Sequence, residues 1–426
     1  MQLEAPRNAN YAATIFRVPA TLKLDGLDNL VAVPVFGYQA LTQKDRQVGD
    51  LVVAFTAETQ LSEEFASANN LYRDTSLNVD PEEVGYLEPK ARIKAIKLRG
   101  HRSDALLMPL ESLEYTEIDI TDLQEGDTFD TLNGIEICRK YVLPVKGAAL
   151  TPGKTKLEKA FSRVDEKIFP LHIDTDQYGK NKHLLTAGRE VVITQKLHGT
   201  SIRVGNVPVL RTKGFWERLA NKVGIQTPTH EFDMVYGSRK VTKDANNPNQ
   251  NHYYGEDIWT LHGKNLDGLI PEGFLVYGEL IGWTPDGSPI QKNYTYDVPK
   301  GEAHLYVYRV ARVDVNGNLT DLSWDAVREF AAARGLKVVP ELWRSQPDEV
   351  DSDVEMLLNE RFAELVDAVG GEDPMVPLSH SKTVDEGVVI RQEGIVPVVL
   401  KAKAGRFLEH ETKLLDAEEV DLESAA

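Results

Sequence analysis

The segment VVITQKLHGTSIR, residues 191–203, constrains the fold of this chain more than any other. Its β-branched run predicts a strand that ends at Lys196, and Gly199 and Thr200 predict a turn after that strand. A strand of this kind delivers one amine into a tight turn. Such an amine, when unprotonated, can attack the α-phosphate of a nucleotide triphosphate and hold the nucleotide as a phosphoramide. Short strings of Lys and Gly are common, so this interpretation needs support from other segments.

Two glutamates supply the first support, because each stands at the end of an apolar strand. Glu279 lies in LVYGELIG and Glu386 begins the segment EGVVIR. A carboxylate in apolar surroundings is costly to bury unless a positive group meets it. Taken alone, each is explained equally well as an exposed carboxylate at a strand end. Together with Lys196 they fit chemistry at a triphosphate, since carboxylates can hold the divalent cation that neutralises it.

Two lysines supply the second support. Lys401 and Lys403 lie two residues apart in VPVVLKAK, so on a strand both side chains point to the same side. Like charges side by side are unfavourable unless an anion lies between them, and a polyphosphate is the obvious candidate. A solvated edge strand is the alternative, and the apolar run before Lys401 argues against it.

The charge distribution is uneven. The net charge of −18 argues against a nucleic-acid partner, but the placement of the charges matters more than their sum. Between Pro89 and Ser103 the chain has six basic residues and no acidic one, and the run ARIKAIKLRG predicts a strand, bulged after Ala95, with its basic side chains on one face. Acidic residues collect instead in 346–374, whose role the sequence does not indicate, and after Arg406.

The length of 426 residues suggests two domains, and the order of elements gives an α+β fold. Residues 1–145 have short apolar runs split by polar turns, which favours a small β-barrel of the OB type. Residues 146–157 are expected to form a linker. Residues 158–426 mix strands and helices and end in an acidic tail.

Two local features of the later region are specific. A helix is expected to begin at Ser323 or Asp325, to bury Val327 and Phe330, and to stop before Gly335. Asn316-Gly317 between two strands predicts a hairpin turn rather than the start of a calcium loop, which would need a glutamate further on.

The cysteine content and the N-terminus indicate a location. Cys138 is the single cysteine, so neither an internal disulfide nor a cysteine metal site is expected. The N-terminal segment has no basic start followed by an apolar core, and no stretch approaches the ~18 apolar residues of a membrane helix. A cytoplasmic protein that does not enter membranes is expected.

Five segments in order resemble the motifs of a known superfamily. KLHGT, VYGEL, LYVYRV, EGVVIR and LKAK are similar to nucleotidyltransferase motifs I, III, IIIa, IV and V of ATP-dependent polynucleotide ligases and capping enzymes, and they span about residues 190–405. Motif I here reads K-L-H-G-T-S, whereas DNA ligases and capping enzymes usually carry K-x-D-G. The β-rich region also precedes the lysine, and little chain follows Lys403. The chain therefore resembles RNA ligases of the group with an N-terminal OB domain followed by an adenylyltransferase domain of antiparallel sheets with flanking helices.

The resemblance implies a role for each matching residue. Lys196 would be the catalytic nucleophile that takes AMP from ATP, and Glu279 and Glu386 would bind a Mg²⁺ or Mn²⁺ ion. Tyr308 would stack on adenine, and Arg239 of motif Ia would contact phosphate. The implied nucleotide-binding residues are Gln195, Gly199, Arg239, Glu279, Tyr308, Glu386, Lys401 and Lys403. The implied RNA-binding residues are Lys90, Arg92, Lys94, Lys97, Arg99 and Arg102.

The sequence departs from the motifs at three places. His198 stands where many relatives have an aspartate that helps to orient water around the metal. Arg309 follows Tyr308 where Asp or Asn is common, which leaves the choice between Tyr306 and Tyr308 open. The gap between Lys196 and Arg239 (239 − 196 = 43 residues) implies an insertion around GFWERLANKVGIQTP.

These features predict an ATP-dependent RNA ligase. It would form a lysyl-AMP, transfer the AMP to an RNA 5′-phosphate and seal that end to a 3′-hydroxyl, with a nicked duplex as the expected RNA partner and RNA repair as the expected role. No obligate protein partner is implied. The alternatives are a GTP-dependent capping guanylyltransferase, a DNA ligase, which lacks support from the domain order, and a catalytically silent RNA-binding protein.

Overall fold

The chain divides into two compact units. The computed structural model describes residues 3–143, 163–172, 175–211, 213–244, 254, 256–355, 358, 378 and 384–417. The expected linker at 146–157 lies outside these residues, as do most of the acidic stretch 346–374 and the end of the acidic tail. The first unit comprises Met1–Pro144, Asp176–Leu184 and Leu400–Glu419, and the second comprises Val145–Thr175, Leu185–Val399 and Val420–Ala426.

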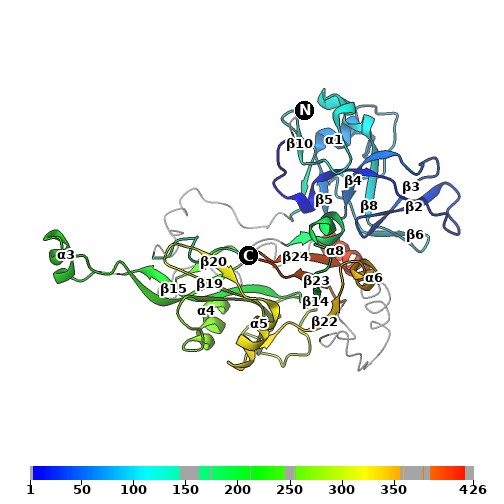
Figure 1. The fold of residues 1–426 in the computed structure, drawn as a ribbon. Coiled ribbons are helices and arrows are strands. Elements are labelled where there is room, and N and C mark those ends of the chain that lie inside the picture. Colours follow the sequence, from blue (N-terminus) through cyan, green and yellow to red (C-terminus); the bar gives the residue numbers. More distant parts are fainter. Residues whose placement is uncertain are drawn as a thin grey trace. The chain divides into compact units, whose positions relative to one another are not determined.

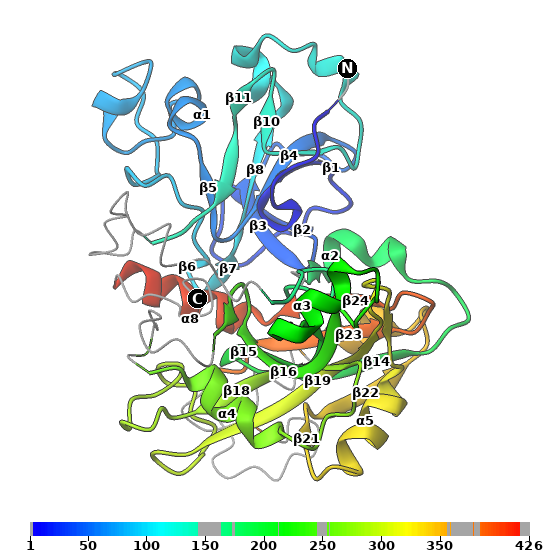
Figure 2. The same ribbon diagram turned by 90° about the vertical axis from the view of Figure 1, so that its left-hand side faces the viewer.

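The first unit is built on a four-stranded antiparallel sheet with the order β8-β4-β1-β9, accompanied by separate strand pairs (Figure 2). The pairs are β2 with β3, β5 with β12, β6 with β7 and β10 with β11. Short β13 pairs in parallel with β24. The strands are β1 (Ala13–Arg17), β2 (Leu30–Val35), β3 (Tyr38–Gln43), β4 (Leu51–Thr56), β5 (Thr59–Leu61), β6 (Ile96–Leu98), β7 (His101–Ser103), β8 (Ala105–Pro109), β9 (Thr128–Phe129), β10 (Thr131–Leu132), β11 (Ile135–Glu136), β12 (Cys138–Lys140), β13 (Asp176–Gln177) and β24 (Val398–Lys403), the last shared with the second unit.

Short helices close the core of the first unit. Phe55, Phe65 and Phe129 are fully buried in this core. Ser62 caps α1 by accepting a hydrogen bond from the Phe65 amide at 3.0 Å. The helices are η1 (Ala9–Tyr11), α1 (Glu63–Ala68), η2 (Thr75–Leu77), η3 (Leu110–Thr116), η4 (Ile120–Asp122), α2 (Tyr178–Asn181), η6 (Lys182–Leu184) and α8 (Gly405–Asp416).

The described strands of the first unit form an open sheet and strand pairs rather than one closed barrel. The expectation of mixed sheets and helices is confirmed at this coarser level, and the OB-type barrel stays a prediction. The segment expected as one bulged strand, ARIKAIKLRG, is a strand only at β6, and Arg99 and Gly100 turn the chain after it with φ angles of 50° and 89°.

The C-terminal helix α8 belongs to the first unit, although the sequence assigned all residues after 157 to the second domain. Leu408 packs against Ala57 and Ala95 in a small buried cluster. The Thr412 hydroxyl accepts a hydrogen bond from the Ala95 amide at 3.0 Å and donates one to Glu58 at 3.0 Å. The helix is therefore an integral part of this unit's core.

The second unit contains two antiparallel arrangements of strands (Figure 1). The larger sheet has the antiparallel order β17-β16-β15-β18-β19-β20, and β21 pairs in parallel with β19. In the other, β14 lies between β22 and β23. The strands are β14 (Val191–Lys196), β15 (Thr200–Leu210), β16 (His230–Ser238), β17 (Thr242–Lys243), β18 (Phe274–Gly282), β19 (Ala303–Val313), β20 (Leu319–Asp321), β21 (Lys337–Val338), β22 (Glu341–Ser345) and β23 (Gly387–Gln392).

The helices of the second unit follow local signals in the sequence. Ser323 caps α5 by accepting a hydrogen bond from the Ala326 amide at 3.3 Å, and the helix buries Val327 and Phe330, as predicted. The predicted Asn316-Gly317 turn joins β19 to β20, with Gly317 at a φ of 83°. The helices are α3 (Phe215–Lys222), α4 (Ile258–Gly263), η7 (Lys264–Leu266), α5 (Trp324–Ala332) and α6 (Val350–Glu355).

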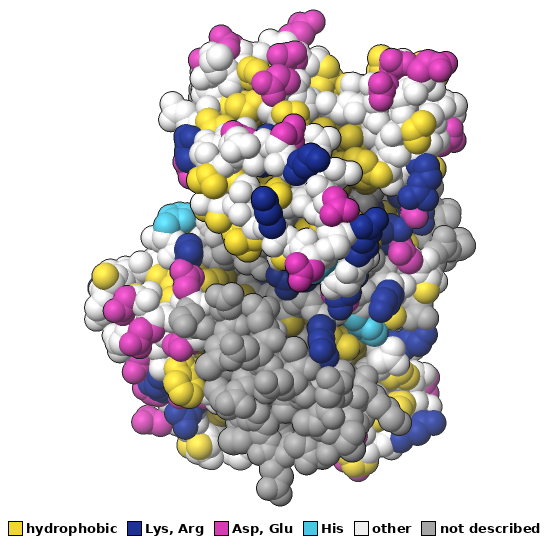
Figure 3. Space-filling model, turned by 90° about the vertical axis from the view of Figure 1, so that its right-hand side faces the viewer, with side chains coloured by type: hydrophobic (Ala, Val, Ile, Leu, Met, Phe, Trp, Pro, Cys, Tyr) yellow, Lys and Arg dark blue, Asp and Glu magenta, His cyan; other side chains and the backbone are white. Residues whose placement is uncertain are grey.

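Charged side chains of both signs share the surface. On the face shown in Figure 3, Lys and Arg side chains lie between Asp and Glu side chains. Mixed charge of this kind reduces the long-range field that a single-sign surface would produce. The net charge of −18 is therefore a poor guide to any one patch.

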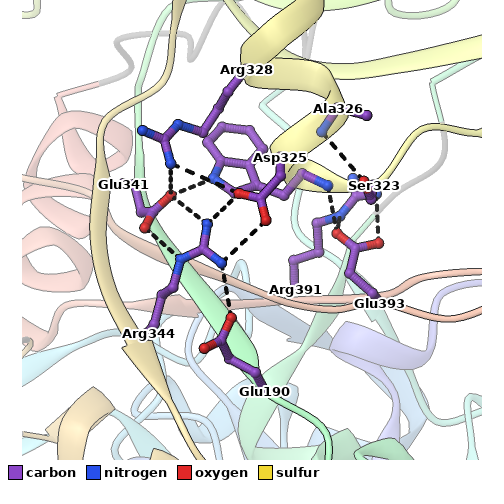
Figure 4. Close-up of polar contacts among 10 residues, drawn as sticks. Glu190, Ser323, Asp325, Ala326, Arg328, Glu341, Arg344, Arg391 and Glu393 are labelled. Carbon is purple, nitrogen blue, oxygen red and sulfur yellow. Dashed lines mark hydrogen bonds and ion pairs between the residues drawn. The ribbon is translucent and has the colours of Figure 1, made fainter.

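An ion-pair network centred on Arg344 ties α5 to strands β14 and β22 (Figure 4). Its guanidinium donates to Glu341 at 2.8 Å and to Glu190 at 2.9 Å, and it also pairs with Asp325. Hydrogen bonds from Arg344 lower the pKa values of Glu341 and Asp325. The strand that ends at Lys196 is thus anchored at its start.

Candidate active site

Lys196 ends strand β14, and its amine meets a buried carboxylate. The register of β14 with β23 places Lys196 opposite Gly387, directly after Glu386. The Lys196 Nζ atom lies 2.8 Å from Oε2 of Glu386. Only 17% of the Lys196 side chain and 2% of the Glu386 side chain are exposed. The two groups that the sequence linked by chemistry are therefore in contact.

The turn after Lys196 is held by the second predicted carboxylate. Oε1 of Glu279 accepts a hydrogen bond from the Gly199 amide at 2.9 Å, and Oε2 accepts one from the Ser201 hydroxyl at 3.2 Å. A Cβ atom at Gly199 would lie 2.3 Å from the carbonyl oxygen of Leu280, so only glycine fits there. Glu279 is buried and fixes the path of the chain beyond the lysine.

His198 lies beside the same carboxylate. Its Nδ1 atom is 3.4 Å from Oε2 of Glu386, and its Nε2 atom is 2.7 Å from the side-chain amide nitrogen of Gln291. The His198 amide donates to the Tyr296 hydroxyl at 2.8 Å. The imidazole ring therefore lies between the Gln291 amide and the Glu386 carboxylate. The histidine that replaces the usual aspartate is thus held in place on three sides.

Gln195 points to the opposite side of β14 from Lys196, as alternation on a strand requires. Its side-chain nitrogen donates to Asp385 at 3.3 Å, and its side-chain oxygen accepts from the Leu378 amide at 3.4 Å. Both Gln195 and Asp385 are buried. This bond ties the Lys196 strand to the residue before Glu386.

Arg239 and Tyr308 lie near a shared residue of the second unit. The backbone oxygen of Arg239, which follows β16, accepts a hydrogen bond from the His172 amide at 3.3 Å. The His172 and Tyr308 rings meet edge to face with their centroids 5.5 Å apart. The two residues taken to contact phosphate and adenine are therefore neighbours of one histidine, and their roles toward a nucleotide stay a prediction.

The choice between Tyr306 and Tyr308 has a structural basis. Tyr306 lies directly opposite Glu279 in the register of β18 and β19, so the two side chains share one face of the sheet. A bulge follows, and Tyr308 is the extra residue between two paired positions. Arg309 then packs over the Tyr277 ring at 4.6 Å and forms an ion pair with Asp321, which explains a basic residue at this position.

Lys401 and Lys403 lie on β24 among the residues of the first unit. The Lys403 Nζ atom is 3.0 Å from both carboxylate oxygens of Glu411 on α8, and it lies 5.1 Å from the centroid of the Phe407 ring. The proposed action of both lysines on a triphosphate stays a prediction.

The donor set near Lys196 suits a hard divalent cation. Glu386 presents a carboxylate oxygen beside the amine, and carboxylate oxygens are preferred ligands of Mg²⁺ and Mn²⁺. Within the described residues, no group of three or more His, Cys, Asp and Glu side chains is arranged to hold an ion by itself. A Mg²⁺ ion typically takes one or two carboxylates together with substrate phosphates. Glu386 fits that pattern.

The comparisons with known proteins agree with this geometry. The family model described as RNA ligase matches residues 189–403, half of the chain. The chain belongs to the RNA ligase family. No curated protein matches the chain.

Solved structures of an RNA ligase from Naegleria gruberi have a similar fold. The structure with PPi has 16% sequence identity and a TM-score of 0.56, and the match covers 94% of this chain and 98% of that chain. A mutant with ATP and Mn has 16% identity and a TM-score of 0.54, covering 95% and 99%. An apo mutant has 16% identity and a TM-score of 0.57, also covering 95% and 99%.

The basic segment of this RNA ligase, Lys90 to Arg102, is largely paired within the first unit. Arg92 is buried, and it forms ion pairs with Glu58 at 3.1 Å and with Asp416 of α8. The expectation that the six residues share one exposed basic face is wrong for Arg92.

The other residues of the segment are partly exposed or exposed, and they also contact residues of the first unit. Lys94 pairs with Glu88 at 2.8 Å and with Asp416 at 2.9 Å. The remaining contacts join Lys97 to Glu409 at 3.1 Å, Arg102 to Asp104 at 3.0 Å, and Arg99 to the backbone oxygen of Gly26 at 2.5 Å, while the Lys90 carbonyl accepts from Gln60 at 2.9 Å.

Sequence reasoning missed several residues that contact the neighbours of Lys196 in this RNA ligase. Asp385, which contacts Gln195, and Gln291 and Tyr296, which contact His198, were not singled out. The aromatic cluster NYTYD at 293–297 was a usable signal, because two tyrosines in a polar loop are unusual without a buried partner.

Among the described helices, none is long and apolar enough to cross a membrane.

Proposed function

We propose that this chain is an ATP-dependent RNA ligase in which Lys196 carries AMP from ATP to RNA. The observation that carries the proposal is the 2.8 Å contact between Lys196 and Glu386. Lys196 stands directly before a turn that Glu279 holds through the Gly199 amide. Structures of the Naegleria gruberi RNA ligase were solved with ATP and Mn and with AMP and Mn. These names support ATP as the nucleotide and a divalent cation as the cofactor.

The reaction has three displacements at phosphorus. The unprotonated amine of Lys196 attacks the α-phosphorus of ATP, the bond to the bridging oxygen breaks, and pyrophosphate leaves. An oxygen of an RNA 5′-phosphate then attacks the AMP phosphorus, and the lysine amine leaves. Finally an RNA 3′-hydroxyl attacks the 5′-phosphate, AMP leaves, and a phosphodiester forms.

The residues that match the nucleotidyltransferase motifs would divide this work. Glu279 keeps the turn in place, so the Lys196 amine and the Gly199 backbone hold one geometry through the reaction. Glu386 would hold the divalent cation, which neutralises phosphate charge when bound. Lys401 and Lys403 would bind the triphosphate through their ammonium groups. His198 fixes the orientation of Glu386, a task that does not require it to bind metal itself.

We also propose that the first unit, up to about residue 145, is an OB-type RNA-binding module and that a nicked duplex is its partner. The partly exposed or exposed basic residues that remain for this role are Lys90, Lys94, Lys97, Arg99 and Arg102. Arg92 is better explained as a structural residue because it is buried between Glu58 and Asp416. A reducing compartment such as the cytoplasm suits the one buried thiol, Cys138.

The test is incubation of the full chain with radiolabelled ATP and Mg²⁺ or Mn²⁺, followed by a denaturing gel. The wild type is expected to carry label, and Lys196→Ala is expected to carry none. Lys264→Ala, which removes an exposed lysine of the same unit, is the matched control and should label normally. Labelled GTP in place of ATP separates a ligase from a capping enzyme. Absence of label from wild type with either nucleotide would refute the proposal.

A further inference from the structure

The insertion between β15 and β16 forms an arm that the proposed reaction does not use. We define the α3 arm as the described residues between Leu210 and His230. β15 begins at Thr200, within the turn that follows Lys196, and stays paired with β16 as far as Leu210 opposite His230. Figure 1 shows α3 at the far end of this long hairpin. Eleven residues of β15 place the arm roughly 33 Å from the start of the strand.

The arm exposes large apolar side chains. Phe215 is 74% exposed and Trp216 is 76% exposed, and their rings meet edge to face at 5.5 Å. Leu219 is also exposed and lies on the same side of the helix at helical spacing, and Val223, the residue after α3, is exposed too. An exposed apolar group of this size at the tip of a hairpin usually marks a binding surface.

The arm is also basic in an acidic chain. Residues 211–225 contain four basic residues and one acidic residue, whereas the whole chain has a net charge of −18. Arg211 pairs with Glu217 at 2.7 Å. The nearby carboxylates of β16 are occupied by Arg163, which lies 2.7 Å from Glu231 and 3.1 Å from Asp233.

Three positive charges of the arm therefore remain available. Within the part of the chain that the structure describes, Lys213, Arg218 and Lys222 form no ion pair with a carboxylate. Lysines beside flat aromatic rings are the combination that binds nucleic acid, because the lysines neutralise phosphates and the rings stack on bases. An anionic bilayer would accept similar chemistry, but a helix of eight residues is only about 12 Å long and offers little area for insertion.

We propose that the α3 arm is a second RNA-binding site, which holds the RNA on the order of ten nucleotides from the reacting phosphate. This inference rests on the proposed RNA ligase function. RNA is favoured over other partners because the unbroken strand β15 joins the arm to the turn after Lys196, where the RNA end would react. Trp216 stacks on a base or on a duplex end, and Lys213 and Lys222 contact phosphates.

The first test compares two variants with matched controls. Trp216→Ala removes the larger ring, and Val396→Ala removes an exposed apolar side chain elsewhere in the same unit. Lys213→Ala with Lys222→Ala removes two charges, and Lys44→Ala with Lys264→Ala removes two exposed charges elsewhere. Binding to a nicked RNA duplex with about 24 base pairs on each side is measured over a range of salt concentrations.

The expected result is position-specific. Trp216→Ala weakens binding roughly tenfold, as loss of one stacked base does. The double lysine variant lowers the slope of log affinity against log salt by about two, more than its control does. Quenching of Trp216 fluorescence on RNA addition disappears in Trp216→Phe. Equal binding by all variants, with the wild type still sealing nicks, would overturn the inference.

The second test uses the length of the arm. Two nicked hairpins are made, each with about six base pairs on one side of the nick and about 24 on the other. If the arm contacts RNA about ten nucleotides away, Trp216→Ala equals wild type on the hairpin trimmed on the contacted side and is defective on the other. Equal defects on both would contradict the distance, and the inference would fall.

Two measurements distinguish a failure of RNA binding by the α3 arm from a failure of the proposed RNA ligase function. Enzyme adenylylation needs no RNA, so every arm variant should label with ATP as wild type does. If wild type neither labels nor seals, the proposed function fails rather than the arm. Sedimentation with vesicles of phosphatidylserine and phosphatidylcholine tests the bilayer alternative. Binding that depends on Trp216, together with unchanged RNA affinity, would replace RNA with a membrane.

Discussion

The Lys196 turn and the basic segment Lys90 to Arg102 both attract attention in the sequence because of their charges, and the structure treats them differently. At the turn, Glu386 contacts the Lys196 amine, and Glu279 holds the backbone that follows at Gly199. In the basic segment, Arg92 and Lys97 form ion pairs with carboxylates of α8, and these pairs hold the helix against the segment. Both kinds of pair join segments that are far apart in the sequence, but the Lys196 pair stands beside a turn that Glu279 holds, whereas the pairs of the basic segment pack a helix onto that segment.

The largest expected effect tests the contact between Lys196 and Glu386 at the turn. Glu386→Gln keeps the shape of the side chain but removes the charge beside Lys196, and it should slow enzyme adenylylation by about 10²-fold or more. Labelling with radioactive ATP measures the rate. Glu393→Gln, at the other end of β23, is a control that should label within a fewfold of wild type. A near-normal rate for Glu386→Gln would make the contact structural.

The next effect tests the buried ion pair between Arg92 of the basic segment and Glu58. Arg92→Ala leaves Glu58 buried without its 3.1 Å partner, and loss of one member of a buried pair costs about 3 kcal/mol. Thermal unfolding measures the loss in stability. Arg99→Ala removes the same charge from an exposed side chain and should barely change the melting temperature. If Arg92→Ala instead weakened RNA binding without destabilising the protein, the basic segment would be an RNA surface after all.

A third, smaller effect depends on pH. Burial and the nearby Glu411 raise the pKa of Glu58 to about 7, against opposing effects of Arg92 and Thr412. A carboxyl group whose pKa is higher in the folded state stabilises the fold fully below its unfolded pKa of about 4.5, and that stabilisation is lost as the pH rises through about 7. The melting temperature should therefore fall between pH 5 and pH 8. Glu58→Gln should flatten this dependence, and an unchanged profile would assign it to other groups.

The smallest effect concerns a partly exposed pair. Lys97 is 51% exposed and lies 3.1 Å from Glu409. Lys97→Ala should change stability by less than about 1 kcal/mol, because solvent and salt screen such pairs. Denaturant unfolding at low and high salt measures the change. A loss as large as that for Arg92→Ala would show that exposure does not separate the two kinds of contact.

Local sequence patterns predicted the parts of the fold that depend on neighbouring residues. The strand that ends at Lys196, the cap at Ser323 and the turn at Asn316-Gly317 are all confirmed. Each follows from alternation, capping or turn chemistry within a few residues. The approach of Glu386 to Lys196 was inferred from chemical need, and the 2.8 Å contact agrees with that inference, whereas the roles of both groups in a reaction stay predictions.

The sequence could not reveal partners that come from far along the chain. Arg92 meets Asp416 across 324 residues, and no local pattern signals that pair. His198 meets Gln291 across 93 residues, and its role was left open for the same reason. The segment ARIKAIKLRG was predicted to be one bulged strand. The alternation of its side chains does not indicate that Arg99 and Gly100 turn the backbone.

The connectivity of the first unit has a practical consequence. Its residues come from three separate stretches of chain, so no single cut releases it whole. A fragment ending near residue 144 would lack α8 and would expose Ala57 and Ala95 to water, along with a buried carboxyl and guanidinium pair. Such a fragment would need a synthetic peptide spanning Gly405–Asp416, supplied in trans, to regain its native packing.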